Sequence, residues 1–304
     1  MKAERRILVV GGMGQVGLEL AQARPYAGYK LVRPRRDELD ITQANSVSDY
    51  LASGEWAGVI NCAAWTAVDL AEDNVAEAFL ANCQGPAILG EAAKALGIPI
   101  IQLSTDYVFD GKLDRPYLET DPVNPLGVYG ASKLAGELAV ACANARSVIL
   151  RTAWVVSAQR ANFLKTMLRI GAGNQKLRVV ADQRGCPTSA ADLAVAALTI
   201  IRRLIEDPQA PAGTYNFVNA GDATWLALAR HIFGQAALRG GPNPEVLPIA
   251  TADYPTRAHR PANSRLDTTK LTADYGIQPR DWRIAVDEIL EELLPTNQHG
   301  SIIN

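Results

Sequence analysis

The chain has 304 residues, of which 48% are hydrophobic and 20% are charged, as in an ordinary globular protein with a sizeable core. A formal net charge of -2 argues against nucleic acid or an anionic membrane as a partner. No apolar run reaches the roughly 18 residues of a membrane-spanning helix. The four cysteines are scattered and the three histidines lack metal-ligand spacing, so we expect a cytoplasmic protein without disulfides or a zinc site.

Buried-strand and helical patterns alternate along the first half of the chain. Strands are predicted at residues 7–10, 29–32, 58–61, 98–103 and 147–150. Helices are predicted from the glycine-rich segment to about residue 23, and at 44–52, 75–80, 86–96 and 129–144. This alternation predicts an α/β fold, with a doubly wound parallel sheet of the Rossmann type and helices on both faces.

After Arg151 the alternation weakens, and we expect a second, smaller α/β lobe. Helices are predicted at 163–170, 192–205, 267–275 and 282–294, and strands at 178–181 and 213–218. The expected organisation is a dinucleotide-binding domain at 1–152, to which segments around 187–220 return, and a substrate-binding lobe at 153–295. Residues 296–304 are polar and are expected to form a flexible tail.

Three glycines, Gly11, Gly14 and Gly17, stand between the first predicted strand and its helix. Glycine permits a tight turn, close backbone approach to a pyrophosphate and close packing of helix on strand. We therefore predict that this loop binds a dinucleotide, together with Gln15 and Val16, which lie between the glycines. A purely structural glycine turn is the alternative.

The end of the second predicted strand carries arginines, Arg33 and Arg35 among them, where an NAD-preferring site usually has an acid. Arginine can hold a 2′-phosphate bidentately, so NADPH is favoured as the cofactor and NADH stays possible. A solvated surface cluster is the alternative. Asp40 and Ile41 are expected to approach the adenine, unless Asp40 only caps a short helix.

A second pattern points to proton transfer. Tyr129 and Lys133 are four residues apart in a predicted helix and share one face. Thr105 offers a hydroxyl at the end of the preceding strand. Because Tyr-x-x-x-Lys also occurs by chance, this pattern gains weight only beside the glycine loop.

With these patterns in this order, the chain resembles the extended short-chain dehydrogenase/reductases. Five further segments, which cover 61–69, 151–155, 182–188, 254–257 and 260–266, make it similar to the dTDP-4-dehydrorhamnose reductase family. The resemblance extends over about residues 6 to 294. It implies that a nicotinamide transfers hydride to the C4 ketone of dTDP-4-dehydro-beta-L-rhamnose in dTDP-rhamnose biosynthesis, and that the protein is a monomer or a homodimer.

In such a reaction an acid must protonate the ketone oxygen, and Tyr129 is the candidate. Free tyrosine has a pKa of about 10, so we expect the Lys133 ammonium to lower the pKa of Tyr129 while it also holds the nicotinamide ribose. Thr105 is expected to support Tyr129 at the same oxygen. Half-buried packing of Tyr129, a surface position for Lys133 and a strand cap at Thr105 are the alternatives.

The other predicted contacts with cofactor and substrate are mainly implied by the family resemblance. The cofactor is expected to contact Ala63, Ala64, Trp65, Thr66 and Leu103. The nucleotide sugar is expected to contact Asp106 through a sugar hydroxyl, Trp154 through the hexose face, and Arg260, Asn263 and Arg265 through the diphosphate and thymine. The alternatives are that Asp106 only shapes a loop turn and that Trp154 only packs in the core. For the other three residues the alternative is a helix cap or a salt bridge.

Some members of this family bridge a dimer through magnesium. Glu19 matches one of their ligands, but Ala191 stands where a glutamate is expected. We therefore predict no metal site and leave a role for Mg²⁺ open. Two rival functions also stay open, namely a nucleotide-sugar 4-epimerase or 4,6-dehydratase and a non-catalytic regulatory subunit of a methionine adenosyltransferase.

Overall fold

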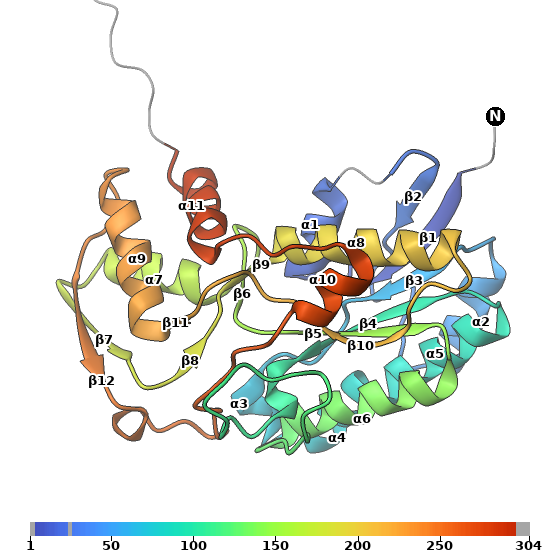
Figure 1. Cartoon of the computed structure of the whole chain (residues 1–304), viewed down its shortest axis with the longest axis horizontal. Coiled ribbons are helices and arrows are strands. Elements are labelled where there is room, and N and C mark those ends of the chain that lie inside the picture. The colour runs from blue at the N-terminus through green and yellow to red at the C-terminus, as the bar shows by residue number, and fades with distance from the viewer. Residues whose placement is uncertain (1–3, 24–25, 296–304) are drawn as a thin grey trace, which may run out of the picture.

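The computed structural model describes residues 4–23 and 26–295, so the predicted tail at 296–304 lies outside the described residues. Its centre is a six-stranded parallel sheet in the order β10-β5-β4-β3-β1-β2 (Figure 1). The strands are β1 (Arg5–Val10), β2 (Tyr29–Val32), β3 (Gly58–Asn61), β4 (Ile100–Thr105), β5 (Ser147–Thr152) and β10 (Gly213–Asn216). The chain leaves β1 for β2 on one side and returns to β3 on the other, which creates a switch point between β1 and β3.

The two faces of the sheet are covered by different helices (Figure 1). Successive side chains of a strand point to opposite faces, so Ile7 and Val9 pack with one set of helices and Leu8 and Val10 with the other. The first set contains α1 (Gln15–Gln22), α8 (Ala190–Glu206) and α10 (Thr269–Tyr275). The second contains α2 (Ala44–Ala52), α5 (Gly85–Ala95) and α6 (Val128–Ala143).

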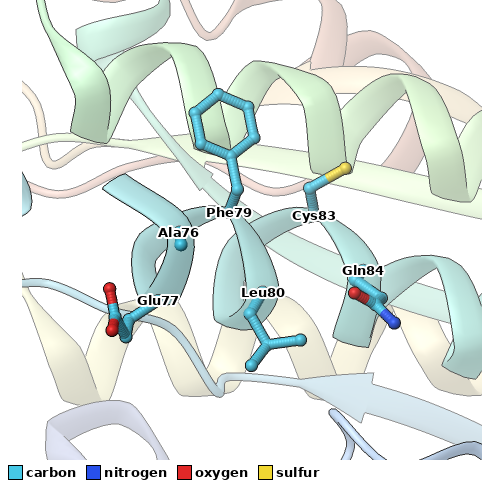
Figure 2. A pocket seen from close by; sticks show the side chains of 6 residues that line it. All are labelled: Ala76, Glu77, Phe79, Leu80, Cys83 and Gln84. Atoms are coloured by element: carbon cyan, nitrogen blue, oxygen red, sulfur yellow. The ribbon is translucent and has the colours of Figure 1, made fainter. Parts of the chain in front are cut away.

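Between β3 and α5 the chain forms α3 (Val68–Ala71), α4 (Val75–Phe79) and a π-helical turn (Leu80–Gln84). The π turn points Asn82 inward, where its amide bonds both the N–H and the carbonyl of Trp65 and the hydroxyl of Ser132. The outer side of this segment carries a shallow pocket lined by Ala76, Glu77, Phe79, Leu80, Cys83 and Gln84 (Figure 2). None of the predicted site residues lines that pocket.

The second lobe has its own apolar core, which includes Leu164, Phe233 and Leu290. It consists of β6 (Val155–Val156), α7 (Phe163–Gly171), β7 (Lys176–Val180), β8 (Arg184–Gly185), β9 (Thr188–Ser189), β11 (Ala223–Thr224), α9 (Trp225–Ala237), β12 (Glu245–Ile249) and α11 (Trp282–Leu293). Helix α9 and strand β12 were not predicted from the sequence. The pairing of β12 with β7 is decided by tertiary contact, because neither strand alternates cleanly between buried and exposed residues.

Part of the second half of the chain, namely α8 and β10, returns to the main sheet. Helix α8 packs against α1, and β10 pairs with β5 at the edge of the sheet. The predicted α/β class, the doubly wound parallel sheet and the smaller second lobe are confirmed. Among the helices of the described residues, none combines the length and apolar character that a membrane crossing requires.

Candidate functional site

The glycine loop lies tightly against the end of β3. Gly11 has a φ of 73°, and a Cβ added there would lie 2.5 Å from the backbone nitrogen of Ala63. A Cβ on Gly17 would lie 2.5 Å from the carbonyl oxygen of Gly11. Helix α1 starts directly after Gly14 with no acidic residue in its first turn, so the positive end of its dipole stays available for an anion. This cradle has the form that a dinucleotide pyrophosphate requires.

A cavity of about 300 Å³ opens beside this loop. Seven predicted cofactor residues line it, namely Gly11, Gly14, Arg35, Asp40, Ile41, Ala63 and Ala64. Residues that the sequence did not single out, such as Met13, Arg36, Thr42 and Cys62, complete the wall. Hydrogen bonds from Thr42 and the charge of Arg36 outweigh burial and lower the pKa of Asp40, which therefore stays ionised at neutral pH.

The arginines at the end of β2 do not all face this cavity. Arg33 turns back, and its guanidinium donates to the carbonyl oxygens of Gly12 at 3.2 Å and Gly17 at 3.5 Å. It therefore holds the glycine loop, and the prediction that it faces a 2′-phosphate is not supported by this geometry. Arg35 and Arg36 line the cavity and form only exposed ion pairs, with Asp37 and Asp40.

The other predicted cofactor residues lie around the same edge of the sheet. Gln15 stands in the first turn of α1, Val16 packs against the core beneath it, and Thr66 is exposed. The indole N–H of Trp65 donates to the carbonyl oxygen of Ala67 at 3.1 Å. The sequence carried no signal for Asn82, which fixes the Trp65 backbone from the π turn.

The proposed proton-transfer residues do come together. Thr105 ends β4, and its hydroxyl accepts from the Tyr107 N–H at 3.2 Å and donates to a carboxylate oxygen of Asp106 at 3.1 Å. Tyr129, in the first turn of α6, faces this corner, and its ring packs edge-on against Tyr107 at a centroid distance of 5.4 Å. The hydroxyl of Thr105 also lies close enough to the Tyr129 phenol to act on its pKa, which it lowers.

Lys133 lies one turn further along α6 and is only 4% exposed. Its ammonium donates to the Leu103 carbonyl oxygen at 2.6 Å. Burial lowers the pKa of Lys133 to about 8, although the nearby carboxylate of Glu137 opposes the shift.

The expectation that Lys133 lowers the pKa of Tyr129 is wrong for this structure. Burial raises the pKa of Tyr129, the negative charge of Asp106 adds to the rise, and only the Thr105 hydroxyl opposes it. The physical reason is that Lys133 is directed to the Leu103 carbonyl, while burial and the charge of Asp106 act on the phenol.

Asp106 is a buried carboxyl at 3% exposure. One of its oxygens has no hydrogen-bond partner within the part of the chain that the structure describes. Burial raises the pKa of Asp106 to about 6, against the effect of hydrogen bonds from Ser264 and Thr105. An unpartnered buried carboxylate oxygen is suited to accept a hydroxyl from a ligand.

Arg260 reaches this corner from the far end of the sequence. Its guanidinium donates to the Tyr107 hydroxyl at 3.0 Å and to Asp69 at 2.7 Å. Tyr107 and Asp69 are therefore site residues that sequence reasoning missed, although Asp69 lies inside a segment that carried the family resemblance and Tyr107 follows Thr105 by two residues.

The indole of Trp154 is closely packed by two residues. Trp225 stacks on one face of it at a centroid distance of 3.5 Å and an angle of 12°. A Cβ added to Gly185 would lie 2.5 Å from the indole carbon Cε2, so the Gly185 backbone also lies against the ring. Trp225 thus occupies one face of the indole, and the contact of Trp154 with a hexose stays a prediction. Trp225, at the start of α9, is a further residue that the sequence did not reveal.

Asn263 is a structural residue. Its amide donates to the carbonyl oxygens of Leu113 and Arg115 at 2.7 and 2.8 Å and accepts from Arg265 at 2.8 Å. The predicted ligand contact of Asn263 is not supported, because these bonds use both its donors and its acceptor. Arg265 also donates to the Asp114 carbonyl, so this pair ties the segment to a loop of the first lobe.

The residues raised for magnesium do not fit a metal site. Glu19 accepts from the Ser157 hydroxyl at 2.5 Å, and Asp192 accepts from Arg280 at 2.9 Å. Within residues 4–23 and 26–295, His, Cys, Asp and Glu side chains form no group of three that could hold a metal ion.

Comparisons with known proteins give the family. The model of the RmlD substrate binding domain matches residues 5–294. A dTDP-4-dehydrorhamnose reductase from Sinorhizobium fredii is 43% identical over 291 residues, which cover 95% of this chain and 98% of that protein. The chain belongs to the dTDP-4-dehydrorhamnose reductase family. The resemblance in the sequence motifs is thus confirmed.

Solved structures of this family share the whole fold. A dTDP-4-dehydrorhamnose reductase from Clostridium acetobutylicum superposes with a TM-score of 0.88 at 35% identity, covering 95% of this chain and 99% of that one. One from Bacillus anthracis in complex with NADP has the same TM-score at 32% identity and the same coverage.

Proposed function

We propose that this protein reduces the C4 ketone of dTDP-4-dehydro-beta-L-rhamnose to give dTDP-L-rhamnose, with NADPH as the hydride donor. Family membership over nearly the whole chain supports the reaction class. The observation that carries the proposal is the convergence of Thr105, Tyr129 and Lys133 at the edge of the sheet that also holds the glycine loop. That arrangement combines a place for a nicotinamide with a proton donor for an oxygen.

When bound, the nicotinamide supplies the hydride. Tyr129 donates the proton to the ketone oxygen as negative charge develops there, and the Thr105 hydroxyl bonds the same oxygen. Because burial raises the pKa of Tyr129, the phenol is fully protonated at neutral pH and begins as an acid. Lys133 is held by the Leu103 carbonyl one turn from Tyr129, and its remaining donors are proposed to hold the nicotinamide ribose.

The nucleotide sugar is proposed to lie between the two lobes, over Thr105 and Asp106. The free oxygen of Asp106 accepts a sugar hydroxyl. The Trp154 indole contacts the sugar, and Arg260, fixed by Tyr107 and Asp69, faces the diphosphate. Arg265 contributes to the nucleotide end.

NADPH is proposed over NADH because Arg35 and Arg36 line the cavity next to the glycine loop, where a 2′-phosphate would bind. Arg35→Ala should weaken NADPH by roughly tenfold and leave NADH unchanged, as expected for the loss of a charged hydrogen bond. Arg33→Ala is the matched control: because Arg33 holds the loop, its loss should weaken both cofactors alike.

The decisive experiment is oxidation of NADPH by the purified protein with dTDP-4-dehydro-L-rhamnose, compared with UDP-linked 4-ketosugars and with the C5 epimer. Oxidation with the dTDP sugar alone supports the proposal. Oxidation with only a different ketosugar replaces the substrate and leaves the mechanism intact. The epimerase or dehydratase alternative predicts bound NAD in the purified protein, and the regulatory-subunit alternative predicts no oxidation with any ketosugar.

A further inference from the structure

Arg160 has an unusual backbone conformation at the boundary between the lobes. It follows β6, is exposed, and has a φ of 55°, a left-handed value that side chains other than glycine rarely adopt. Its guanidinium Nε donates to the Met13 carbonyl oxygen at 2.7 Å. Met13 belongs to the glycine loop and lines the cavity beside it. A strained conformation thus directs an arginine from the second lobe onto the cofactor loop of the first.

Two neighbours keep this segment in place. The Asn162 amide donates to the Gln15 side chain at 3.0 Å, and the Ser157 hydroxyl donates to Glu19 at 2.5 Å. Gln15 and Glu19 both lie on α1, whose first turn starts at the glycine loop. Residues 157–162 therefore hold the first two turns of α1 by side-chain contacts on either side of Arg160.

Among the described residues no Asp or Glu oxygen lies within 4.0 Å of the Arg160 guanidinium. The glycine loop and the first turn of α1 carry no acidic side chain. Two acids near this segment are bonded to other residues, since Glu19 accepts from Ser157 and Glu292 accepts from Gln159. The Nη groups of Arg160 are consequently free to bind an anion at the positive end of the α1 dipole.

We propose that Arg160 is a cofactor-binding residue that contacts the pyrophosphate of the dinucleotide, and that Asn162 and Ser157 are positioning residues that hold it there. The proposal deepens the function given above and rests on the glycine loop being the cofactor site. It assigns the pyrophosphate to a residue of the second lobe, whereas Arg35 and Arg36 serve the 2′-phosphate.

The test is titration of the full-length protein with NADPH and NADH in the absence of any nucleotide sugar, followed by calorimetry or nicotinamide fluorescence. Both cofactors contain the pyrophosphate, so Arg160→Gly should weaken both by the same factor, roughly tenfold. Glycine accepts the left-handed backbone, so this variant should unfold at no lower temperature than the parent. Arg35→Ala should instead weaken NADPH alone.

A second pair of variants and probes separates charge from loop packing. Arg160→Gln keeps a donor at the position of Nε for the Met13 carbonyl but has neither the charge nor the Nη groups, and it should bind both cofactors as weakly as Arg160→Gly. Arg160→Gly should weaken ADP, which has the diphosphate, and leave 2′-AMP unchanged. Unaltered NADPH and NADH affinities, a loss confined to NADPH, or an Arg160→Gln variant with parental affinity would each overturn the proposal. A wrong sugar substrate would affect none of these titrations.

Discussion

The ammonium of Lys133 lies 2.6 Å from the carbonyl oxygen of Leu103, two residues before the end of β4. This bond fastens the first half of α6 to the carboxyl edge of the sheet. Because Tyr129 precedes Lys133 by one turn, the same bond sets the phenol beside Thr105. Lys133 and Leu103, which were both expected to contact the cofactor, thus also contact each other.

Tyr129→Phe removes the proposed proton donor and keeps the ring. We expect kcat to fall by roughly a hundredfold to ten-thousandfold, which is the range for loss of a general acid. Binding of NADPH and of the nucleotide sugar should change little, and both are measured by titration. Tyr107→Phe is the control, since it removes a phenol that bonds Arg260 and should mainly raise KM. A Tyr129→Phe enzyme with near-parental kcat would rule out the assignment.

The activity should decline at alkaline pH. Burial lowers the pKa of Lys133 from 10.5 to about 8, so its charge is lost as the pH rises through 8. If the ammonium holds the nicotinamide ribose, turnover at limiting NADPH should decrease above about pH 8. Single-turnover rates from pH 6 to 10 measure this, and Lys133→Met should lack the alkaline limb of the profile.

Asp106 should make the free protein less stable as the pH rises. Its folded pKa is raised from 3.8 to about 6, so the folded state binds more protons than the unfolded state between these values. The free energy of unfolding therefore falls with increasing pH across that window. Asp106→Asn should resist urea better than the parent at pH 7.5, with the gain absent below pH 4. Equal urea midpoints for the Asp106→Asn variant and the parent at pH 7.5 would contradict this account.

Trp225 should act on the substrate through Trp154. Aromatic pairs contribute about 0.5–1.5 kcal/mol beyond their buried area, and here the pair fixes the position of the Trp154 indole. Trp225→Leu should raise KM for the nucleotide sugar by roughly threefold to tenfold and leave NADPH binding unchanged. Trp56→Leu is a matched control, because that indole lies in the core on the other side of the sheet and should affect stability alone.

The buried ion pair of Glu137 and Arg151 should matter for stability. The two side chains are 4% and 5% exposed and share two short hydrogen bonds, at 2.9 and 2.7 Å. Glu137→Gln leaves the arginine charge buried without a full partner and should reduce the free energy of unfolding by about 3–5 kcal/mol. The joint variant Glu137→Leu with Arg151→Met should lose much less. Urea unfolding of the three proteins decides between these outcomes.

Much of the first lobe could be predicted from local patterns. β2, α2 and β3 have the predicted bounds, because strand alternation and the glycine, proline and polar breaks are short-range signals. Helix α9 was not predicted, because Gly234 interrupts its helical pattern of apolar residues and the glycine- and proline-rich residues 240–244 follow it. Strand β12 has no clear period of its own and exists through its pairing with β7.

The sequence by itself indicated the residues that we propose for the reaction: a glycine loop for a dinucleotide, a Tyr-x-x-x-Lys helix and a threonine at a strand end, because each of these depends on neighbours a few positions away. Only the tertiary structure decided how they are used. It turned Arg33 onto the glycine loop, stacked Trp225 on Trp154, and directed Lys133 to the Leu103 carbonyl. These choices depend on burial and on contacts between residues far apart in the chain, which no local pattern contains.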